Sequence, residues 1–234
     1  MAPPTLLSTG TGTPRVAVPT DQVGRRRLAW GGGLLTAFLL LTACTALHTF
    51  NSLDTALDTR FHNLALANGG LVSAMTMLSQ VGGPSAALGL GLILAALFYL
   101  RRDRRRACFC AVASAGAFVL ASAFKLLVDR HRPSWPEPIA HAAGPSYPSG
   151  HATGSATLAA VLIVGVLPLV TAVIWRWIAL LVLIGYAAAI PISRLVLGVH
   201  YPSDVIAGVL LGTGWTLLCA AILLRSGSSP TSPE

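Results

Sequence analysis

Long apolar stretches separated by short polar segments form the main pattern of this 234-residue chain. A helix needs about 20 predominantly apolar residues to cross the hydrocarbon core of a bilayer. Six stretches are long enough or nearly so, and the second is the shortest: Leu28–His48, Pro84–Leu100, Ala107–Val128, His151–Val170, Ile174–Ser193 and Asp204–Leu224. We therefore predict an all-α membrane protein in which residues 28–224 form six transmembrane helices and one compact helical bundle.

The remaining segments are predicted to be two tails and one long connector. Residues 1–27, which are rich in Pro, Thr and Gly, and residues 225–234 lack apolar periodicity, so we expect disordered tails. Residues 51–83 are polar to amphipathic, which predicts an outer connector with a helix lying on the membrane interface. The connector ends at the helix-breaking sequence Gly82-Gly83-Pro84.

The composition supports a membrane protein and excludes two other classes. Hydrophobic residues make up 54% of the chain and charged residues 10%, whereas soluble domains carry about 25% charged residues. Disordered chains are excluded because they contain far fewer apolar residues. The 16 Lys and Arg residues outnumber the 8 Asp and Glu residues. In so apolar a chain, this excess indicates contact with a bilayer and not with a nucleic acid.

The positions of the cations predict how the chain is oriented in a cell membrane. With a cytoplasmic N-terminus, 11 Lys and Arg residues fall in cytoplasmic segments and 5 in outer segments, in agreement with the positive-inside rule. The strongest cluster is Arg101–Arg106, which is interrupted only by Asp103. We expect a multi-pass protein with both termini in the cytoplasm. The outer cations are Arg60, Lys125, Arg130, Arg132 and Arg194.

The four cysteines lack the spacing of a zinc site and lie in apolar stretches. We interpret Cys44, Cys108, Cys110 and Cys219 as buried small hydrophobic residues. The sequence that ends at Cys44 resembles a lipoprotein cleavage site, and processing there would remove the first helix. The long tail before the first helix and the five further spans favour an uncut helix.

Three polar segments are not explained by topology. The first, Lys125–Pro133, ends the third apolar stretch. The second, Pro148–His151, begins the fourth stretch, and the third, Ser193–Asp204, joins the fifth to the sixth. All three fall on the predicted outer face of the membrane, which indicates one shared site.

Cations and a helix start in these segments favour anion binding. Lys125, Arg132 and Arg194 stand at the rim of a hydrophobic body, where unpaired charge is costly. A bound anion would balance them, and Lys together with Arg is a usual combination around phosphoryl oxygens. Ser149 and Gly150 stand where a helix is predicted to begin, so free backbone N–H groups can form an anion cradle.

Two histidines could supply reactivity. His200 and Asp204 are four residues apart, so the carboxylate can hold one ring nitrogen and leave the other to attack. His151, at the predicted start of the fourth helix, could protonate a leaving alkoxide. A nucleophile, an orienting carboxylate, an acid and an anion clamp together suit phosphoryl transfer.

The three segments resemble the signature of the type 2 phosphatidic acid phosphatase superfamily, a family of lipid phosphate phosphatases. The signature reads Lys-x6-Arg-Pro, Pro-Ser-Gly-His and Ser-Arg-x5-His-x3-Asp, and all eleven defining residues are present at the family's spacings. The six apolar stretches extend the resemblance over most of the chain. Soluble vanadate-dependent haloperoxidases have a similar anion site, but six predicted spans favour the lipid-phosphatase branch.

The resemblance implies a role for each matching residue. His200 would be the nucleophile that forms a phosphohistidine, Asp204 would orient it, and His151 would act as general acid. The phosphoryl oxygens would be held by Lys125, Arg132, Ser149, Gly150 and Arg194. The resemblance also implies that no metal and no other cofactor is needed.

The substrate class follows from the same resemblance. A polyprenyl diphosphate such as undecaprenyl diphosphate is favoured, because a site facing outward suits recycling of that carrier, with phosphatidic acid or phosphatidylglycerol phosphate as other substrates. One alternative is a lipid phosphotransferase of the same family, which the signature does not distinguish from a phosphatase. Another alternative is a non-catalytic transporter or structural membrane protein.

Several polar residues outside the signature also carry predictions. Arg130 lies two residues before Arg132, and we hypothesise that it holds the second phosphate of a diphosphate. Trp135 is a candidate to line the substrate mouth. The histidines outside the signature are interpreted as interfacial or solvated, and they are His48, His62, His131 and His141.

Overall fold

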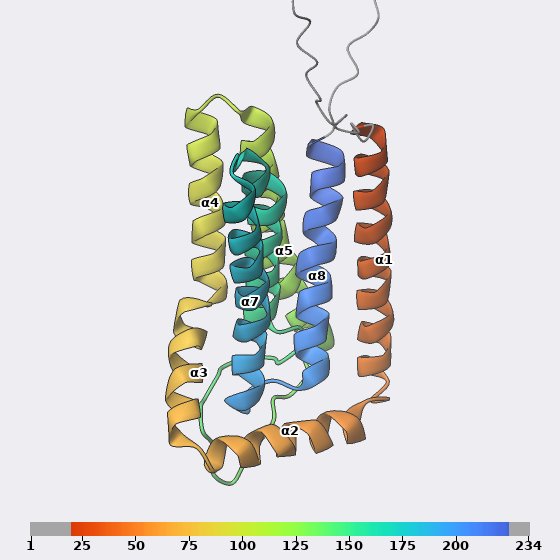
Figure 1. The fold of residues 1–234 in the computed structure, drawn as a ribbon. Coiled ribbons are helices and arrows are strands. Elements are labelled where there is room, and N and C mark those ends of the chain that lie inside the picture. Colours follow the sequence, from red (N-terminus) through yellow and green to blue (C-terminus); the bar gives the residue numbers. More distant parts are fainter. Residues whose placement is uncertain (1–19, 225–234) are drawn as a thin grey trace, which may run out of the picture.

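The computed structural model describes residues 20–224, and all regular elements in that range are helical (Figure 1). The helices are α1 (Thr20–Ala46), α2 (Asn51–Leu66), α3 (Gly69–Val81), α4 (Pro84–Leu100), α5 (Arg104–Val128), α6 (Gly150–Val161), α7 (Val173–Val196) and α8 (Pro202–Leu223). A π-helical turn (Leu162–Val166) and a 3-10 turn (Leu167–Leu169) continue α6 toward α7.

The six predicted membrane spans are confirmed. Within the described residues, six helical segments are long and apolar enough to cross a bilayer. Their bounds are Gln22–Ala46, Gly69–Leu100, Arg104–Val128, Gly150–Leu169, Val173–Val196 and Pro202–Leu223. The chain is therefore an all-α membrane protein, as the apolar pattern predicts.

The second span differs from its predicted bounds. We expected it to begin at Pro84, but α3 and α4 together form one 32-residue apolar segment, Gly69–Leu100. Proline is tolerated at the first position of a helix, so Gly82-Gly83-Pro84 separates two helices of one span without ending the apolar segment. A side chain at Gly82 would overlap Ile190 of α7, which explains a glycine at this junction.

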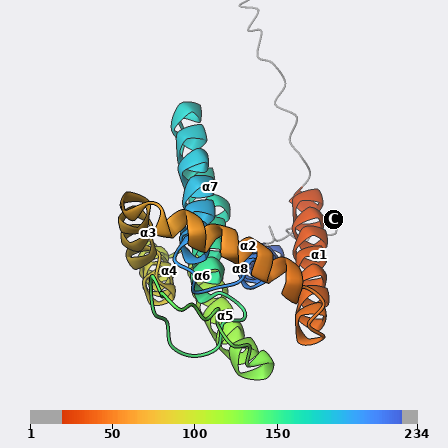
Figure 2. The same ribbon diagram turned by 90° about the horizontal axis from the view of Figure 1, so that it is seen from below.

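The assignment of residues 51–83 to an outer connector is therefore wrong in its second half. Only α2 lies across one end of the bundle, as the interfacial helix was predicted to do (Figures 1 and 2). α3 instead runs along the bundle below α4 and packs against α7. Its N-terminus is capped by Asn68, whose side chain accepts a hydrogen bond from the Leu71 backbone N–H at 3.0 Å.

The first helix also starts earlier than predicted. α1 begins at Thr20, so residues 20–27, which we assigned to the tail, are helical. The predictions for residues 1–19 and 225–234 lie outside the described residues. We predicted that all four cysteines are buried. Cys110 and Cys219 are buried, but the prediction is wrong for Cys108, which is exposed, and for Cys44, which is half-buried.

Close packing between α6 and α8 positions the polar segments. A Cβ atom on Gly208 would lie 2.6 Å from the Ser149 carbonyl oxygen, and one on Gly212 would lie 2.5 Å from the Thr153 carbonyl oxygen. Glycine at both positions therefore lets the two helix backbones touch, as small residues do in membrane bundles. The start of α6 is held directly beside the start of α8, where the Ser149 N–H donates to the Asp204 carbonyl oxygen at 2.9 Å.

The two ends of the bundle have different characters. The end of α5, the start of α6, the end of α7 and the start of α8 gather at the end that α2 crosses (Figures 1 and 2). These are the places where the three polar segments stand. The start of α1, the end of α8 and the arginine-rich turn between α4 and α5 lie at the opposite end.

Candidate active site

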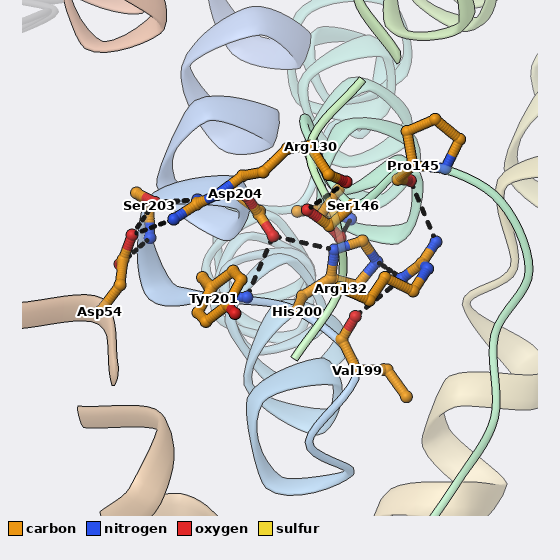
Figure 3. A network of polar contacts seen from close by, with 12 residues as sticks. Asp54, Arg130, Arg132, Pro145, Ser146, Val199, His200, Tyr201, Ser203 and Asp204 are labelled. Atoms are coloured by element: carbon orange, nitrogen blue, oxygen red, sulfur yellow. Dashed lines mark hydrogen bonds and ion pairs between the residues drawn. The ribbon is translucent and has the colours of Figure 1, made fainter. Parts of the chain in front are cut away.

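The structure brings the predicted nucleophile and its orienting carboxylate together. His200 lies in the turn before α8, is 2% exposed, and places its Nδ1 atom 3.5 Å from Oδ2 of Asp204 (Figure 3). Asp204 is fully buried in the first turn of α8, where Oδ2 also accepts the Tyr201 backbone N–H at 3.0 Å. This capping bond fixes the carboxylate at the helix start, beside the imidazole.

The hydrogen bond between His200 and Arg132 defines the tautomer of His200. Nε2 lies 3.0 Å from Nη1 of Arg132. A guanidinium can only donate, so Nε2 accepts and the ring proton resides on Nδ1, facing Asp204. Burial lowers the pKa of His200 to about 4, and the nearby cations Arg132 and Lys125 lower it further against the opposing effect of Asp204. At neutral pH the imidazole is therefore neutral, with a lone pair on Nε2.

Arg132 belongs to the loop between α5 and α6 and is surrounded by backbone carbonyl groups. It donates to the Val199 oxygen at 2.7 Å and to the Gly144 oxygen at 2.9 Å. Both Arg132 and Lys125 donate to the Pro145 oxygen, at 3.2 and 2.7 Å. Burial lowers the pKa of Arg132, while Asp204 opposes that change. The two predicted phosphate-binding cations thus converge on one point beside His200.

The third predicted cation, Arg194, is 8% exposed in the last turn of α7. Its Nη1 donates to the hydroxyl of Ser79, whereas its buried Nε has no hydrogen-bond partner among the described residues. A buried guanidinium with an unused donor is costly unless an acceptor arrives. Arg194 is therefore suited to an anionic ligand.

His151, the predicted acid, is held by the same serine. Its Nε2 lies 3.2 Å from the carbonyl oxygen and 3.4 Å from the hydroxyl of Ser79, which is 7% exposed at the end of α3. Ser79 thus contacts both His151 and Arg194. Sequence reasoning missed this residue because it belongs to no motif and stands in the predicted connector.

Ser149 is placed as a helix cap. Its buried hydroxyl accepts the Ala152 backbone N–H at 3.5 Å, so it begins α6 as the helix-start pattern predicts. Gly150 follows as the first residue of α6, next to the side chain of Lys125. The start of α6 and the three cations therefore surround the same space.

Arg130 has a different environment from the one predicted. We expected it to hold a second phosphate, but Nη1 donates to Asp204 Oδ1 and Nη2 donates to Asp54 Oδ2, at 2.7 and 2.8 Å (Figure 3). Its guanidinium also lies 4.2 Å from the ring centroid of Tyr201. The structure therefore places the Arg130 side chain on internal carboxylates, and its binding of a second phosphate stays an untested prediction.

Two stacked aromatic rings lie next to the turn that carries His200. Trp135 stacks on His62 of α2 with 3.9 Å between ring centroids, and its Nε1 donates to the Gly198 oxygen at 3.1 Å. His62 is 4% exposed, so its assignment as interfacial or solvated is wrong. Trp135 and Arg132 line a cavity of about 220 Å³, as expected for a residue at a substrate mouth.

A second cavity runs from the site into the membrane-spanning part of the bundle. Its volume is about 240 Å³, and it lies between α4, α5 and α6. Lys125 and Gly150 stand at its polar end, and its other walls carry small or apolar side chains such as Ala87, Leu88 and Ala117. The cavity joins the cation cluster to an apolar environment.

Comparison with known proteins gives relatives of one kind. The family model described as the PAP2 superfamily matches residues 106–228. The decaprenylphosphoryl-5-phosphoribose phosphatase of Mycobacterium tuberculosis is 41% identical over 127 residues, which are 52% of this chain and 64% of that protein. Its counterpart in Mycolicibacterium smegmatis is 38% identical over 145 residues, covering 59% and 72% of the two chains. An undecaprenyl-diphosphatase of Sulfolobus acidocaldarius is 32% identical over 143 residues, covering 56% and 61%.

A solved structure gives the same result over a longer stretch. The crystal structure of a transmembrane PAP2-type phosphatidylglycerolphosphate phosphatase from Bacillus subtilis matches with a TM-score of 0.68 and 26% identity. The match covers 81% of this chain and 93% of that one. Together with the family model, which matches more than half of the sequence, these similarities confirm the resemblance: the chain belongs to the PAP2 superfamily.

Proposed function

We propose that this protein is an integral-membrane lipid phosphate phosphatase that works through a phosphohistidine intermediate without a metal ion. The observation that carries the proposal is the neutral, buried imidazole of His200, whose Nε2 lone pair faces Arg132 while Nδ1 faces Asp204. A nucleophile needs such a lone pair at a point where a phosphoryl group can be held. The cations beside it would supply that binding.

The reaction proceeds in two steps. In the first, Nε2 of His200 attacks phosphorus, the bond from phosphorus to the lipid oxygen breaks, and His151 transfers a proton to that oxygen. Asp204 stabilises the positive charge that develops on the His200 ring. In the second step, water attacks phosphorus, His151 takes the water proton, and the nitrogen–phosphorus bond breaks to release phosphate and neutral His200.

Lys125, Arg132 and Arg194, with the start of α6, stabilise the phosphoryl oxygens. The unused Nε donor of Arg194 gains an acceptor when the phosphoryl group binds. Arg132 exchanges its backbone carbonyl partners and Nε2 of His200 for phosphoryl oxygens, which accept stronger, charge-assisted hydrogen bonds, and this exchange frees the Nε2 lone pair for attack. Both changes favour the group that carries negative charge in the transition state.

The substrate is proposed to carry its phosphate or diphosphate on a polyprenyl chain. The 240 Å³ cavity between α4, α5 and α6 supports a lipid substrate, because it leads from Lys125 into the apolar bundle. The names of the relatives support the polyprenyl class, since they include a decaprenylphosphoryl-5-phosphoribose phosphatase and an undecaprenyl-diphosphatase. Phosphatidylglycerol phosphate is a second candidate, favoured by the Bacillus subtilis structure.

The site is proposed to face the outside of the cell. Arg101, Arg102 and Arg104–Arg106 gather at the turn between α4 and α5, at the opposite end of the bundle from His200. The positive-inside rule assigns that turn to the cytoplasm. The active-site end then lies at the outer surface, with α2 at headgroup depth.

The deciding experiment uses the purified protein in detergent with excess chelator. Phosphate release is measured from undecaprenyl diphosphate, phosphatidic acid and phosphatidylglycerol phosphate for the wild type, His200→Asn and His151→Asn. His48→Asn serves as the matched control, because His48 is an exposed histidine in the turn between α1 and α2. We expect the wild type and the control to be active and the His200 and His151 variants to lose activity at least about 1,000-fold.

A second measurement detects phosphate bound covalently to the protein. The reaction with a substrate labelled in its phosphate is stopped during turnover, and the label on the protein is compared after treatment with acid and with base. A phosphohistidine is labile in acid and stable in base, so the wild type should carry base-stable label and His200→Asn should carry none. Phosphate release by His200→Asn at the wild-type rate, or release that the chelator abolishes, would overturn the proposed mechanism.

A further inference from the structure

A carboxylate of the surface helix α2 reaches the start of α8. Asp54 is 3% exposed, and its Oδ1 atom accepts the Ser203 backbone N–H at 3.0 Å. Its Oδ2 atom accepts the Ser203 hydroxyl at 2.5 Å and Nη2 of Arg130 at 2.8 Å. The residue adjacent to Asp204 and the guanidinium that contacts Asp204 are therefore both held by Asp54.

Arg130 connects Asp54 to the proposed catalytic pair. Its Nη1 donates to Asp204 Oδ1 and to the Ser203 hydroxyl, each at 2.7 Å, and its plane lies on the ring of Tyr201. A planar guanidinium fixed on three sides can hold a carboxylate in one orientation. Burial alone would lower the pKa of Arg130, but Asp204 and Asp54 hold that pKa above its ordinary value, so the side chain remains charged.

Asp204 divides its two oxygen atoms between two tasks. Oδ1 is bound by Arg130, and Oδ2 faces Nδ1 of His200 and the Tyr201 N–H (Figure 3). Rotation of the carboxylate would break the contact with Arg130. Arg130 therefore controls which oxygen faces the imidazole, and Asp54 controls where Arg130 lies.

We infer that Asp54 and Arg130 are positioning residues of the phosphatase reaction, which together fix the orientation and the charge of Asp204 toward His200. This inference rests on the proposed function. The positive charge of Arg130 partly neutralises the negative charge of Asp204. It therefore weakens the attraction between Asp204 and a proton on His200. Asp54 in turn offsets Arg130, so the two residues influence His200 with opposite signs.

The kinetic test compares Arg130→Gln, Arg130→Lys and Asp54→Asn. The control is Arg60→Gln, because Arg60 is an exposed arginine on α2. With the phosphate-binding cations intact, we expect kcat for lipid phosphate to fall about 10- to 100-fold in Arg130→Gln while KM stays within about threefold. Arg130→Lys keeps the charge but loses the planar fork, so it should recover only part of the loss.

The pH profile separates positioning from general structural support. The ionisable groups facing His200 are Asp204 on α8, Lys125 on α5 and Arg132 in the loop. Removing the Arg130 charge should raise the pKa of His200 and move the acid limb of kcat/KM up by about one pH unit. Asp54→Asn should not move the limb upward, because it removes a negative charge.

A measurement without substrate keeps the inference testable even when turnover fails. In protein labelled with [15N]histidine, the His200 signal is assigned by its loss in His200→Asn and is titrated in detergent micelles. Its midpoint should rise in Arg130→Gln and stay unchanged in Arg60→Gln. If the wild type releases no phosphate from any lipid, the proposed function fails, while this titration still decides the role of Arg130.

Two results would overturn the inference. An unchanged kcat and His200 titration in Arg130→Gln would mean that the contact is structural only. A raised KM at unchanged kcat would mean that Arg130 binds the substrate. If Arg130→Gln does not fold, a reduced kcat in Arg130→Lys supports the inference and an unchanged kcat overturns it. A rise of the His200 midpoint in Asp54→Asn would also overturn it.

Discussion

At the scale of single residues, the site combines buried ionisable groups whose partners differ in kind. His200 is neutral because burial outweighs the attraction of Asp204 for its proton. Arg194 keeps an unused donor, whereas Arg130 is occupied by two carboxylates. Arg194 and Arg130 therefore differ in their environment and not in their chemistry, because the folded chain gives them different partners.

Asp58 provides a test of the electrostatics around the site. It is 1% exposed on α2, and its Oδ1 has no hydrogen-bond partner among the described residues. Burial, followed by repulsion from Asp204 and Asp54 and opposed by Arg130, raises the pKa of Asp58 to about 7. The folded state then binds more protons than the unfolded state between about pH 4 and 7, so stability falls as pH rises through that window.

Asp58→Asn should remove this loss. We expect its melting temperature in detergent to exceed that of the wild type at pH 8, and the difference to shrink as the pH is lowered toward 4. Thermal melting at pH 8 and pH 5 measures both values. The raised pKa of Asp58 is contradicted if the melting temperature of Asp58→Asn, measured relative to the wild type, is lower at pH 8 than at pH 5.

Ser79 tests the link between α3 and the site. In Ser79→Ala the Arg194 guanidinium loses its hydroxyl acceptor, and a hydrogen bond to a charged group is worth about 1.5–3 kcal/mol. We expect KM for the lipid phosphate to rise about tenfold, since Arg194 is no longer held in place. Ser73→Ala is the control, because Ser73 lies exposed on the same helix. Equal kinetics for the two variants would exclude a role for Ser79.

At the scale of elements, helix packing decides where the motif residues meet. α8 touches α6 through glycine positions, so Pro148–His151 and the start of α8 lie side by side. The short helices of the 51–83 segment add two contacts that the motifs do not contain. α2 contributes Asp54, which contacts Arg130, and α3 contributes Ser79, which contacts Arg194.

The contact between α6 and α8 gives a prediction at this scale. Gly212→Ala would place a methyl group 2.5 Å from the Thr153 carbonyl oxygen, so the helices must separate. We expect the free energy of unfolding to fall by about 1–3 kcal/mol and activity to fall with it. Gly185→Ala is the matched control, because no atom lies within 4 Å of the added methyl group there. Melting temperature in detergent checks both, and an unchanged Gly212→Ala would refute the packing argument.

At the scale of the whole molecule, the bundle separates two groups of charged residues along its length. One end carries the arginine-rich turn between α4 and α5, and the end that α2 crosses carries the cations and histidines of the site. Between them, six spans present mostly apolar side chains outward. Exposed residues such as Leu181, Val182 and Ile184 on α7 suit contact with lipid.

The proposed orientation is tested by labelling in intact cells. In a variant whose four cysteines are replaced by serine, one cysteine is introduced at exposed His141 near the site, and in a second variant at exposed Arg102. A membrane-impermeant thiol reagent should label the first variant in intact cells and the second only after permeabilisation. The reverse pattern would place the site in the cytoplasm.

The amino-acid sequence by itself determined the class of fold and the set of motif residues. Apolar length alone predicts the six spans, because the cost of burying backbone and charge in hydrocarbon leaves few other solutions. The fixed spacings of the three polar segments carry the family resemblance, since the proposed chemistry at one phosphorus atom needs those residue types. Both signals are local in the chain, so they can be read from it.

The tertiary structure alone decided which side chains support that chemistry. Asp54 lies 76 residues from Arg130, and Ser79 lies 115 residues from Arg194. No spacing or periodicity relates such pairs, because the contacts form only when α2 and α3 pack against the bundle. Arg130 shows that the sequence does not reveal the partners of a charged residue. Its charge is evident in the sequence, but its partners are the carboxylates that the folded chain brings within 3 Å.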